Sequence, residues 1–155
     1  MEPGCGSGLI SMIAAKKGAY VTATDINPTA VEFLKKNCLR NNLQVKVLQS
    51  DLFADIPAKQ YDVIAINPPY YKKNPVTAKD HAWFCGEYGE YFSGLFGSLS
   101  AYVHADTEVL MVLFEGCDMQ MIHDFAAANN FSLDCVQSKQ NMLEKNFIYK
   151  ITKIK

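Results

Sequence analysis

Apolar runs alternate along the chain with amphipathic segments, and these two patterns predict strands and helices in turn. The predicted strands cover residues 20–24, 45–48, 61–66 and 108–114. The predicted helices cover residues 9–17, 28–41, 88–103 and 119–128. Because strands and helices alternate, the sequence predicts an α/β fold with a doubly wound, mostly parallel, Rossmann-like sheet.

The first two helices carry specific end signals. Gly18 follows the first helix in a C-cap position. Asn27 is a preferred capping residue, and Pro28 suits the first turn of the second helix. Five residues are expected to form the apolar side of that helix, namely Val31, Phe33, Leu34, Cys38 and Leu39.

Both ends of the chain bear on the topology. Residues 131–137 and 146–153 are β-rich with no helix between them, which predicts an antiparallel hairpin closing one edge of the sheet.

In doubly wound folds a central first strand precedes the glycine-rich loop, whereas only Met1 and Glu2 precede it here. Neighbours of a missing strand would have unpaired backbone groups. We therefore expect residues 1–155 to be a single, N-terminally shortened domain, with the first strand before Met1.

The composition is that of a packed soluble domain, because 49% of the residues are hydrophobic and 20% are charged. Apolar stretches are far shorter than the roughly 20 residues that span a bilayer, and no signal peptide is recognisable. A cytoplasmic protein without membrane contact is therefore expected. The five cysteines are odd in number and none lies in a C-x-x-C pair, so neither disulfides nor a metal site is predicted.

The basic residues are lysines with one exception, Arg40, and the formal net charge is −1. Proteins that read duplex sequence usually combine a basic face with arginines that bind guanine edges. The composition therefore disfavours a sequence-reading duplex binder, while a small basic rim for an RNA loop stays open.

The segment E-P-G-C-G-S-G (residues 2–8) has the form G-x-G-x-G, which differs from the G-x-G-x-x-G spacing of dinucleotide folds. Its glycines allow a ligand to approach the backbone closely. Asp25 ends the second strand, where a carboxylate can accept hydrogen bonds from ribose hydroxyls. Asp51 follows the third strand, within reach of an adenine amino group.

The tetrapeptide Asn67-Pro68-Pro69-Tyr70 directly follows the apolar run of residues 61–66. Because two prolines end regular structure, a rigid loop at the carboxyl end of a central strand is expected. A planar NH2 nitrogen is a poor nucleophile with a delocalised lone pair. The carbonyl oxygens of Asn67 and Pro68 can accept its two N–H groups, and Tyr70 can pack on its flat face. These three residues are the catalytic candidates.

These motifs together resemble the class I S-adenosylmethionine-dependent methyltransferases, and the resemblance runs along nearly the whole chain. N-P-P-Y is similar to the signature of family members that methylate exocyclic amino groups of bases or the side-chain amide of glutamine. The resemblance implies S-adenosylmethionine as cofactor and a defined set of cofactor-binding residues. They are Glu2, Gly4, Gly6, Gly8, Asp25, Ile26, Asp51, Leu52 and Asn67.

The stretch W-F-C-G-E-Y-G (residues 83–89) and the terminal hairpin further resemble the HemK-like protein-glutamine methyltransferases. This implies a glutamine side-chain amide as acceptor, a peptide-chain release factor as partner and, as in some relatives, a small zinc-binding activator subunit. Residues 1–155 do not include the N-terminal helical domain of bacterial members, and they equally resemble small-domain methyltransferases of ribosomal RNA. An exocyclic amino group of adenine or guanine in RNA or DNA therefore stays the alternative acceptor.

Two readings from other classes also stay open. A dinucleotide-dependent oxidoreductase would share the fold, but it has no use for N-P-P-Y and prefers a different glycine spacing. A non-catalytic partner subunit would have no chemical need for the intact set of Asp25, Asp51 and Asn67. The nearby aromatic residues Tyr71 and Trp83 either cover the acceptor or simply pack their own loop.

Overall fold

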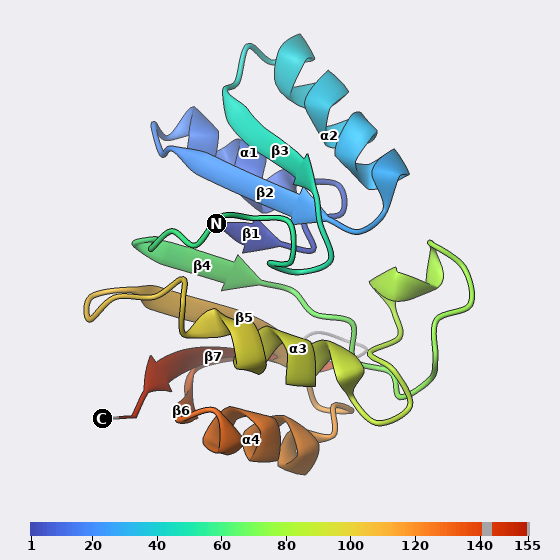
Figure 1. Ribbon diagram of the computed structural model, residues 1–155, viewed down its shortest axis with the longest axis vertical. Coiled ribbons are helices and arrows are strands. Elements are labelled where there is room, and N and C mark those ends of the chain that lie inside the picture. Colours follow the sequence, from blue (N-terminus) through green and yellow to red (C-terminus); the bar gives the residue numbers. More distant parts are fainter. Residues whose placement is uncertain (141–143, 155) are drawn as a thin grey trace. The chain divides into compact units, whose positions relative to one another are not determined.

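The computed structural model describes residues 1–140 and 144–154. The chain divides into two compact units, Met1–Pro57 and Ala58–Lys155. Each unit contains a sheet with helices beside it (Figure 1).

The first unit has a parallel sheet of order β1-β2-β3, formed by β1 (Glu2–Pro3), β2 (Val21–Asp25) and β3 (Val45–Gln49). Its helices are α1 (Leu9–Lys16) and α2 (Pro28–Arg40). These helices, β2 and β3 match the predicted elements closely, whereas β1 was not among the predicted strands. Both helices contribute to one hydrophobic core. Its members are Cys5, Ala23, Val31, Leu34, Cys38 and Val47, with Met12, Leu43 and Val45 packed against them.

The start of α2 confirms the predicted capping signal. The side chain of Asn27 accepts a 2.9 Å hydrogen bond from the backbone N–H of Thr29. Three of the five expected apolar residues are buried, namely Val31, Leu34 and Cys38. The expectation for Phe33 and Leu39 is wrong, because their side chains are 53% and 80% exposed. The buried positions follow helical spacings of three and four, and Phe33 and Leu39 are each rotated about 100° from a buried neighbour.

The second unit has a four-stranded sheet of order β4-β5-β7-β6. Its strands are β4 (Val63–Ile66), β5 (Glu108–Phe114), β6 (Phe131–Gln140) and β7 (Lys145–Lys153). β4 and β5 are parallel, and β7 pairs antiparallel with both β5 and β6. This confirms the predicted C-terminal hairpin, with β6 at the end of the strand order, and with it the α/β fold class. The expected strand before Met1 and the single-domain organisation stay predictions.

Two helices, α3 (Glu90–Leu99) and α4 (Met119–Ala128), belong to this unit; in Figure 1, α3 passes in front of the sheet and α4 lies below it. The prediction of one helix over residues 88–103 is too long at both ends. Gly89 precedes α3 with a φ of 80°, a left-handed conformation that does not continue a helix. After α3 the chain turns, and the Tyr102 N–H donates to the Leu99 carbonyl at 3.0 Å.

The core of the second unit contains many large apolar side chains. Fully buried side chains come from α3, β5, α4 and β6, and they include Phe92, Leu95, Phe96, Leu99, Val109, Met111, Leu113, Ile122 and Phe131. No helix in the described part of the chain has the length and apolar character that a membrane crossing needs.

The segment between β4 and α3 has little regular structure, as predicted for residues 71–87. We call residues 71–88 the aromatic loop. It contains one short 3-10 helix, η1 (Asp80–Ala82), and a single β-bridge joins Tyr71 to Phe84 at its base.

Candidate functional site

The glycine-rich loop between β1 and α1 is built on left-handed backbone. Gly4, Gly6 and Gly8 have φ values of 68°, 51° and 71°. A Cβ atom at Gly4 or Gly6 would meet no described atom within 4 Å, whereas one at Gly8 would come within 2.8 Å of Leu34 Cγ. Gly4 and Gly6 therefore expose backbone that a ligand can approach, while Gly8 allows the loop to pack on α2.

Asp25, at the carboxyl end of β2, holds this loop in place. One carboxylate oxygen accepts a 2.7 Å hydrogen bond from the backbone N–H of Gly6. The other accepts a 2.8 Å hydrogen bond from the backbone N–H of Asn27, and the residue is only 9% exposed. Because each carboxylate oxygen has two lone pairs, one on each oxygen stays available for ligand hydroxyl groups.

The carboxyl ends of β2 and β3 are tied together beside Asp25. The backbone N–H of Ser50 donates to the Asp25 carbonyl at 3.0 Å, and the Thr24 hydroxyl donates to the Leu52 carbonyl at 3.3 Å. Leu52 has a φ of 48°, a left-handed conformation that costs a leucine about 1–2 kcal/mol. Strained backbone of this kind clusters at ligand sites. Four candidates, Asp25, Ile26, Asp51 and Leu52, therefore lie at one edge of this sheet.

Two of the candidates at this edge differ in exposure. The Asp51 side chain is exposed to solvent, and Ile26 is half-buried. The backbone carbonyl of Ile26 accepts a 3.4 Å hydrogen bond from the Gln49 side chain. Asp51 is thus accessible to a ligand from solvent, as the prediction of an adenine contact requires.

Glu2 has a partner that the sequence did not suggest. It is 6% exposed, and its Oε2 atom accepts hydrogen bonds from the backbone N–H of Ser11, at 2.8 Å, and from the Ser11 hydroxyl. Burial raises the pKa of this carboxyl group above its usual 4.5, although the Ser11 hydrogen bonds oppose the shift. Glu2 therefore joins β1 to the first turns of α1.

Cys5 lies inside the glycine-rich loop, but its thiol is not poised to react. It is 6% exposed, and burial, with smaller contributions from Asp25 and Glu2, raises its pKa to about 12. A thiol in such surroundings stays protonated and is a poor nucleophile.

In the second unit, the N-P-P-Y loop directly follows β4, as predicted. Pro68 and Pro69 are buried, whereas the Asn67 side chain is exposed and Tyr70 is half-buried. The backbone N–H groups of Tyr70 and Tyr71 both donate to the Trp83 carbonyl, at 3.2 and 3.0 Å. The loop thus presents the Asn67 carboxamide to solvent from a backbone that the aromatic loop holds.

The ring of Tyr70 packs against other aromatic rings. Its centroid lies 4.4 Å from that of Phe114, the last residue of β5, and 5.0 Å from that of Tyr71. Burial raises the pKa of the Tyr70 hydroxyl, which therefore stays protonated near neutral pH. Sequence reasoning missed Phe114, although its position at the carboxyl end of a strand parallel to β4 was a usable signal.

The aromatic loop is ordered by contacts within itself and with α4. Asp80 accepts hydrogen bonds from the backbone N–H groups of Val76 and Thr77, at 2.9 and 2.8 Å. Lys72 forms a 2.9 Å ion pair with Asp118, the N-cap of α4, and this hydrogen bond holds the Asp118 pKa below its usual range.

Several large side chains of this loop nevertheless face solvent. Tyr71, Val76, Trp83 and Tyr88 are 48%, 85%, 57% and 74% exposed. An ordered loop with exposed aromatic groups is suited to bind a partner molecule.

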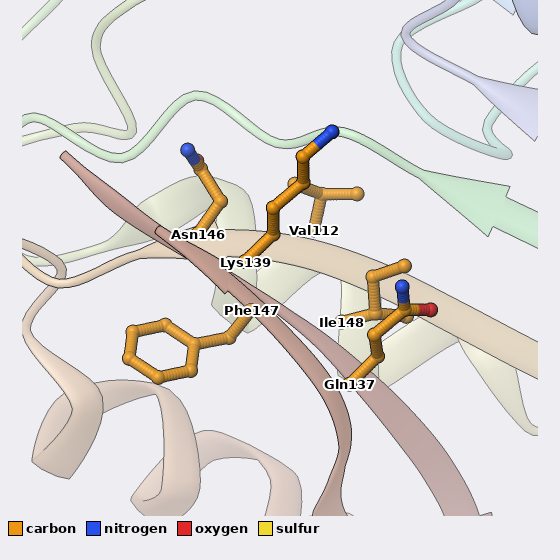
Figure 2. Close-up of a pocket in the computed structure, with 6 residues that line it drawn as sticks. All are labelled: Val112, Gln137, Lys139, Asn146, Phe147 and Ile148. Carbon is orange, nitrogen blue, oxygen red and sulfur yellow. The ribbon is translucent and has the colours of Figure 1, made fainter. Parts of the chain in front are cut away.

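A pocket lies at the strands β5, β7 and β6. It is lined by Val112, Gln137, Lys139, Asn146, Phe147 and Ile148. Figure 2 shows the Lys139 and Asn146 side chains pointing to one side of the sheet and the Phe147 ring pointing away from them. Asn146 is the register partner of Phe114, so this pocket adjoins the strand position of Phe114. The sequence did not predict it.

The comparisons with known proteins agree with these motifs. The family model described as the methyltransferase small domain matches residues 1–84. A candidate protein N5-glutamine methyltransferase of Methanocaldococcus jannaschii is 48% identical over 71 residues, which are 45% of this chain and 36% of that protein. A tRNA1(Val) (adenine(37)-N6)-methyltransferase of Flavobacteriaceae bacterium strain 3519-10 is 27% identical over 157 residues, 96% of this chain and 61% of that protein. The chain thus spans less than two thirds of the length of either relative.

Solved structures show the same fold. The E. cuniculi Mtq2-Trm112 complex, which methylates the eRF1 translation termination factor, matches with a TM-score of 0.72 and 18% identity, covering 98% of this chain and 82% of that one. The T. thermophilus 16S rRNA N2 G1207 methyltransferase, solved with S-adenosylmethionine and guanosine, matches with a TM-score of 0.68 and 17% identity, covering 99% of this chain and 36% of that one. With its fold shared by cofactor-binding methyltransferases and more than half of its residues matched by the family model, the chain belongs to the methyltransferase small domain family.

Proposed function

We propose that the chain is the catalytic part of an enzyme that transfers a methyl group from S-adenosylmethionine to a planar NH2 nitrogen. The observation that carries this proposal is the N-P-P-Y loop itself. Its Asn67 carboxamide is exposed, while its prolines are buried and its backbone is held by the Trp83 carbonyl. The buried prolines and the hydrogen-bonded loop thus hold the backbone from which the Asn67 side chain can reach an acceptor.

The residues of the first unit fit the cofactor. Gly4 and Gly6 leave open space beside left-handed backbone, which suits the amino-acid portion, and Asp25 retains lone pairs for ribose hydroxyls. Asp51 and the strained Leu52 suit the adenine. Glu2 is assigned to the methionine amino group, and in that role it would use the oxygen that Ser11 does not occupy. When bound, S-adenosylmethionine supplies a methyl group that its sulfonium makes electrophilic.

The role proposed for the second unit is mainly to orient the acceptor nitrogen. An amide or aniline-like nitrogen is a poor nucleophile because its lone pair is delocalised. The Asn67 side chain and the Pro68 carbonyl would accept its two N–H groups, which leaves the nitrogen lone pair free to react, while Tyr70 would pack on the flat group. As the nitrogen bonded the methyl carbon, the carbon–sulfur electron pair would stay on sulfur to give S-adenosylhomocysteine, and the nitrogen would release one N–H proton to solvent water. Positioning of this kind can contribute roughly 7–11 kcal/mol.

The aromatic loop favours a protein acceptor, specifically a glutamine side-chain amide. Two of its lysines are engaged within the unit, Lys72 with Asp118 at 2.9 Å and Lys73 over the Phe84 ring at 5.0 Å. Val76, the most exposed of its large hydrophobic residues, suits an apolar polypeptide contact better than a phosphate backbone. Similarity to the Methanocaldococcus protein supports the same acceptor. A release factor as partner and a small activator subunit as a second chain belong to this proposal, by analogy with the E. cuniculi complex.

A specific observation also favours a second candidate acceptor. The relative aligned over 96% of this chain is named as a tRNA adenine-N6 methyltransferase, and its acceptor is an exocyclic amino group. Exposed Trp83 and Tyr88 can stack on an unpaired base. The same Asn67 and Tyr70 chemistry applies to that nitrogen.

The test is methyl transfer from labelled S-adenosylmethionine to separated protein, RNA and DNA fractions of the source cells. The first proposal is supported if the label is in the protein fraction, is removed by protease and not by nuclease, and is recovered as methylglutamine after digestion. Label in RNA as a methylated amino group supports the second. The Asn67→Ala variant is the matched negative control. Cofactor binding without label in any fraction, with or without added cell extract, contradicts both and favours the non-catalytic partner subunit.

A further inference from the structure

The Phe114 ring is enclosed between two specific neighbours. On one side it packs against Tyr70, with ring centroids 4.4 Å apart and planes inclined by 49°. On another side lies Gly116, where an added Cβ atom would come within 2.5 Å of Phe114 Cζ. The short spacing leaves no room for a side chain at position 116, so the glycine permits the observed ring position.

The backbone beneath this ring is also fixed. Phe114 ends β5 and pairs in register with Asn146 of β7. Its carbonyl accepts a 3.1 Å hydrogen bond from the Cys117 N–H, and the following Glu115 N–H donates to the Lys145 carbonyl at 2.9 Å. The backbone of Phe114 is therefore part of a paired strand, whereas Tyr70 lies in a loop without regular structure.

We propose that Phe114 is a positioning residue for the methyl transfer, and that it acts by fixing the plane of the Tyr70 ring on which the acceptor packs. The inference rests on the proposed function, because it assigns Tyr70 the acceptor contact. The Trp83 carbonyl fixes the Tyr70 backbone, but a backbone hydrogen bond leaves the side-chain torsions free to rotate. Contact with Phe114, reinforced by Tyr71 at 5.0 Å, restricts the ring. Gly116 acts on Tyr70 only through Phe114.

The first test is a double-mutant cycle measured by steady-state kinetics. Phe114→Leu is expected to lower kcat/KM for the labelled acceptor about 3- to 10-fold, the range of an aromatic pair contact. In the Tyr70→Leu background the same substitution is expected to cost less than about 2-fold, because its target ring is gone. Phe114→Tyr keeps a ring and is expected to restore most of the activity. Affinity for S-adenosylhomocysteine is expected to stay the same throughout.

Two further variants separate positioning from general stability. Phe125→Leu makes the same change at another half-buried phenylalanine of this unit, on α4, and is expected to leave kcat/KM within about 2-fold. Gly116→Ala displaces the Phe114 ring without shortening it and is expected to reproduce the Phe114→Leu loss. Equal losses from Phe114→Leu in both Tyr70 backgrounds, or an equal loss from Phe125→Leu, would overturn the inference.

A measurement without catalysis distinguishes this inference from the proposed function. The Tyr70 ring protons, assigned by their loss in Tyr70→Phe, are expected to shift in the NMR spectrum of Phe114→Leu and to stay in place in Phe125→Leu. If the wild-type protein methylates no fraction while these shifts occur, the proposed function is wrong although the ring contact stands. If methylation occurs and the Tyr70 signals do not respond to Phe114→Leu, the role given to Phe114 is wrong.

Discussion

The carboxylate of Asp25 accepts a 2.7 Å hydrogen bond from the backbone N–H of Gly6, so the acidic residue at the end of β2 and the glycine-rich loop form one structural element. Asp25 reaches the loop across the parallel pairing of β1 with β2, in which Pro3 lies opposite Thr24. The residue proposed to bind the ribose therefore also shapes the backbone proposed to bind the amino-acid portion. Substitution of Asp25 affects both parts of the cofactor site.

Asp25→Ala is expected to weaken binding of S-adenosylhomocysteine by about 10- to 150-fold, since a charge-assisted contact of roughly 1.5–3 kcal/mol is lost. Isothermal titration calorimetry measures the dissociation constant directly. Asp55→Ala, which removes an exposed carboxylate from the same unit, is the matched control and is expected to leave it unchanged. An unaltered dissociation constant in Asp25→Ala would remove Asp25 from the cofactor site.

Gly8→Ala is expected to destabilise the protein more than Gly4→Ala. Both changes place alanine at a left-handed φ, which costs about 1–2 kcal/mol, but only at Gly8 does the new methyl group overlap the Leu34 side chain. The overlap adds about 1–3 kcal/mol of overpacking. Urea unfolding compares the two variants. A loss for Gly4→Ala as large as that for Gly8→Ala would show that backbone strain alone governs both positions.

The buried carboxyl group of Glu2 predicts a pH dependence of stability. Its pKa is raised above 4.5 in the folded protein, so the folded state holds this proton more tightly than the unfolded state. This contribution is fully present below the unfolded pKa, and it is lost as the pH rises through the folded pKa. The unfolding free energy of wild type is therefore expected to fall relative to Glu2→Gln as the pH rises above 4.5.

Denaturant unfolding of wild type and Glu2→Gln at a series of pH values between 4 and 8 measures this difference. Ser11→Ala removes a hydrogen bond that lowers the Glu2 pKa. In the Ser11→Ala background, the effect of Glu2→Gln on the unfolding free energy is therefore expected to change more steeply with pH. A constant difference across the series, or one of opposite sign, would contradict the assigned pKa direction.

Local signals explain which features could be predicted from the sequence. Asn27 and Pro28 define a helix start through their own conformational preferences, and the observed cap matches them. The terminal hairpin followed from two β-rich segments without an intervening helix. The positions of Asp25 and Asn67 at strand ends needed only the periodicity of the strands before them.

Features that depend on contacts between distant residues were not predicted. Glu2 meets Ser11 only once β1 and α1 are in place, and Phe114 meets Tyr70 across strands separated in sequence by α3. The left-handed φ of Leu52 is unusual for leucine and has no sequence signal. Phe33 was wrongly predicted to lie on the apolar side of α2, because the hydrophobicity of a residue alone does not say which side of a helix meets the sheet.

Asn67 is proposed to serve methyl transfer to an NH2 nitrogen, and the turnover of Asn67→Ala and Asn67→Asp on the labelled acceptor tests this role. The alanine variant is expected to lose about 100-fold or more in kcat, comparable with one preorganised hydrogen bond of about 2.7–4 kcal/mol, while affinity for S-adenosylhomocysteine changes little. Asn41→Ala removes an exposed carboxamide in the other unit and is the control.

The aspartate variant keeps an oxygen acceptor at position 67 and is expected to retain more activity than the alanine variant. This expectation is tested by measuring steady-state kcat and the dissociation constant for S-adenosylhomocysteine for wild type and both variants. The expected order of kcat is wild type, then the aspartate variant, then the alanine variant, at nearly constant cofactor affinity. Loss of cofactor affinity in parallel with kcat, or an alanine variant more active than the aspartate one, would contradict it.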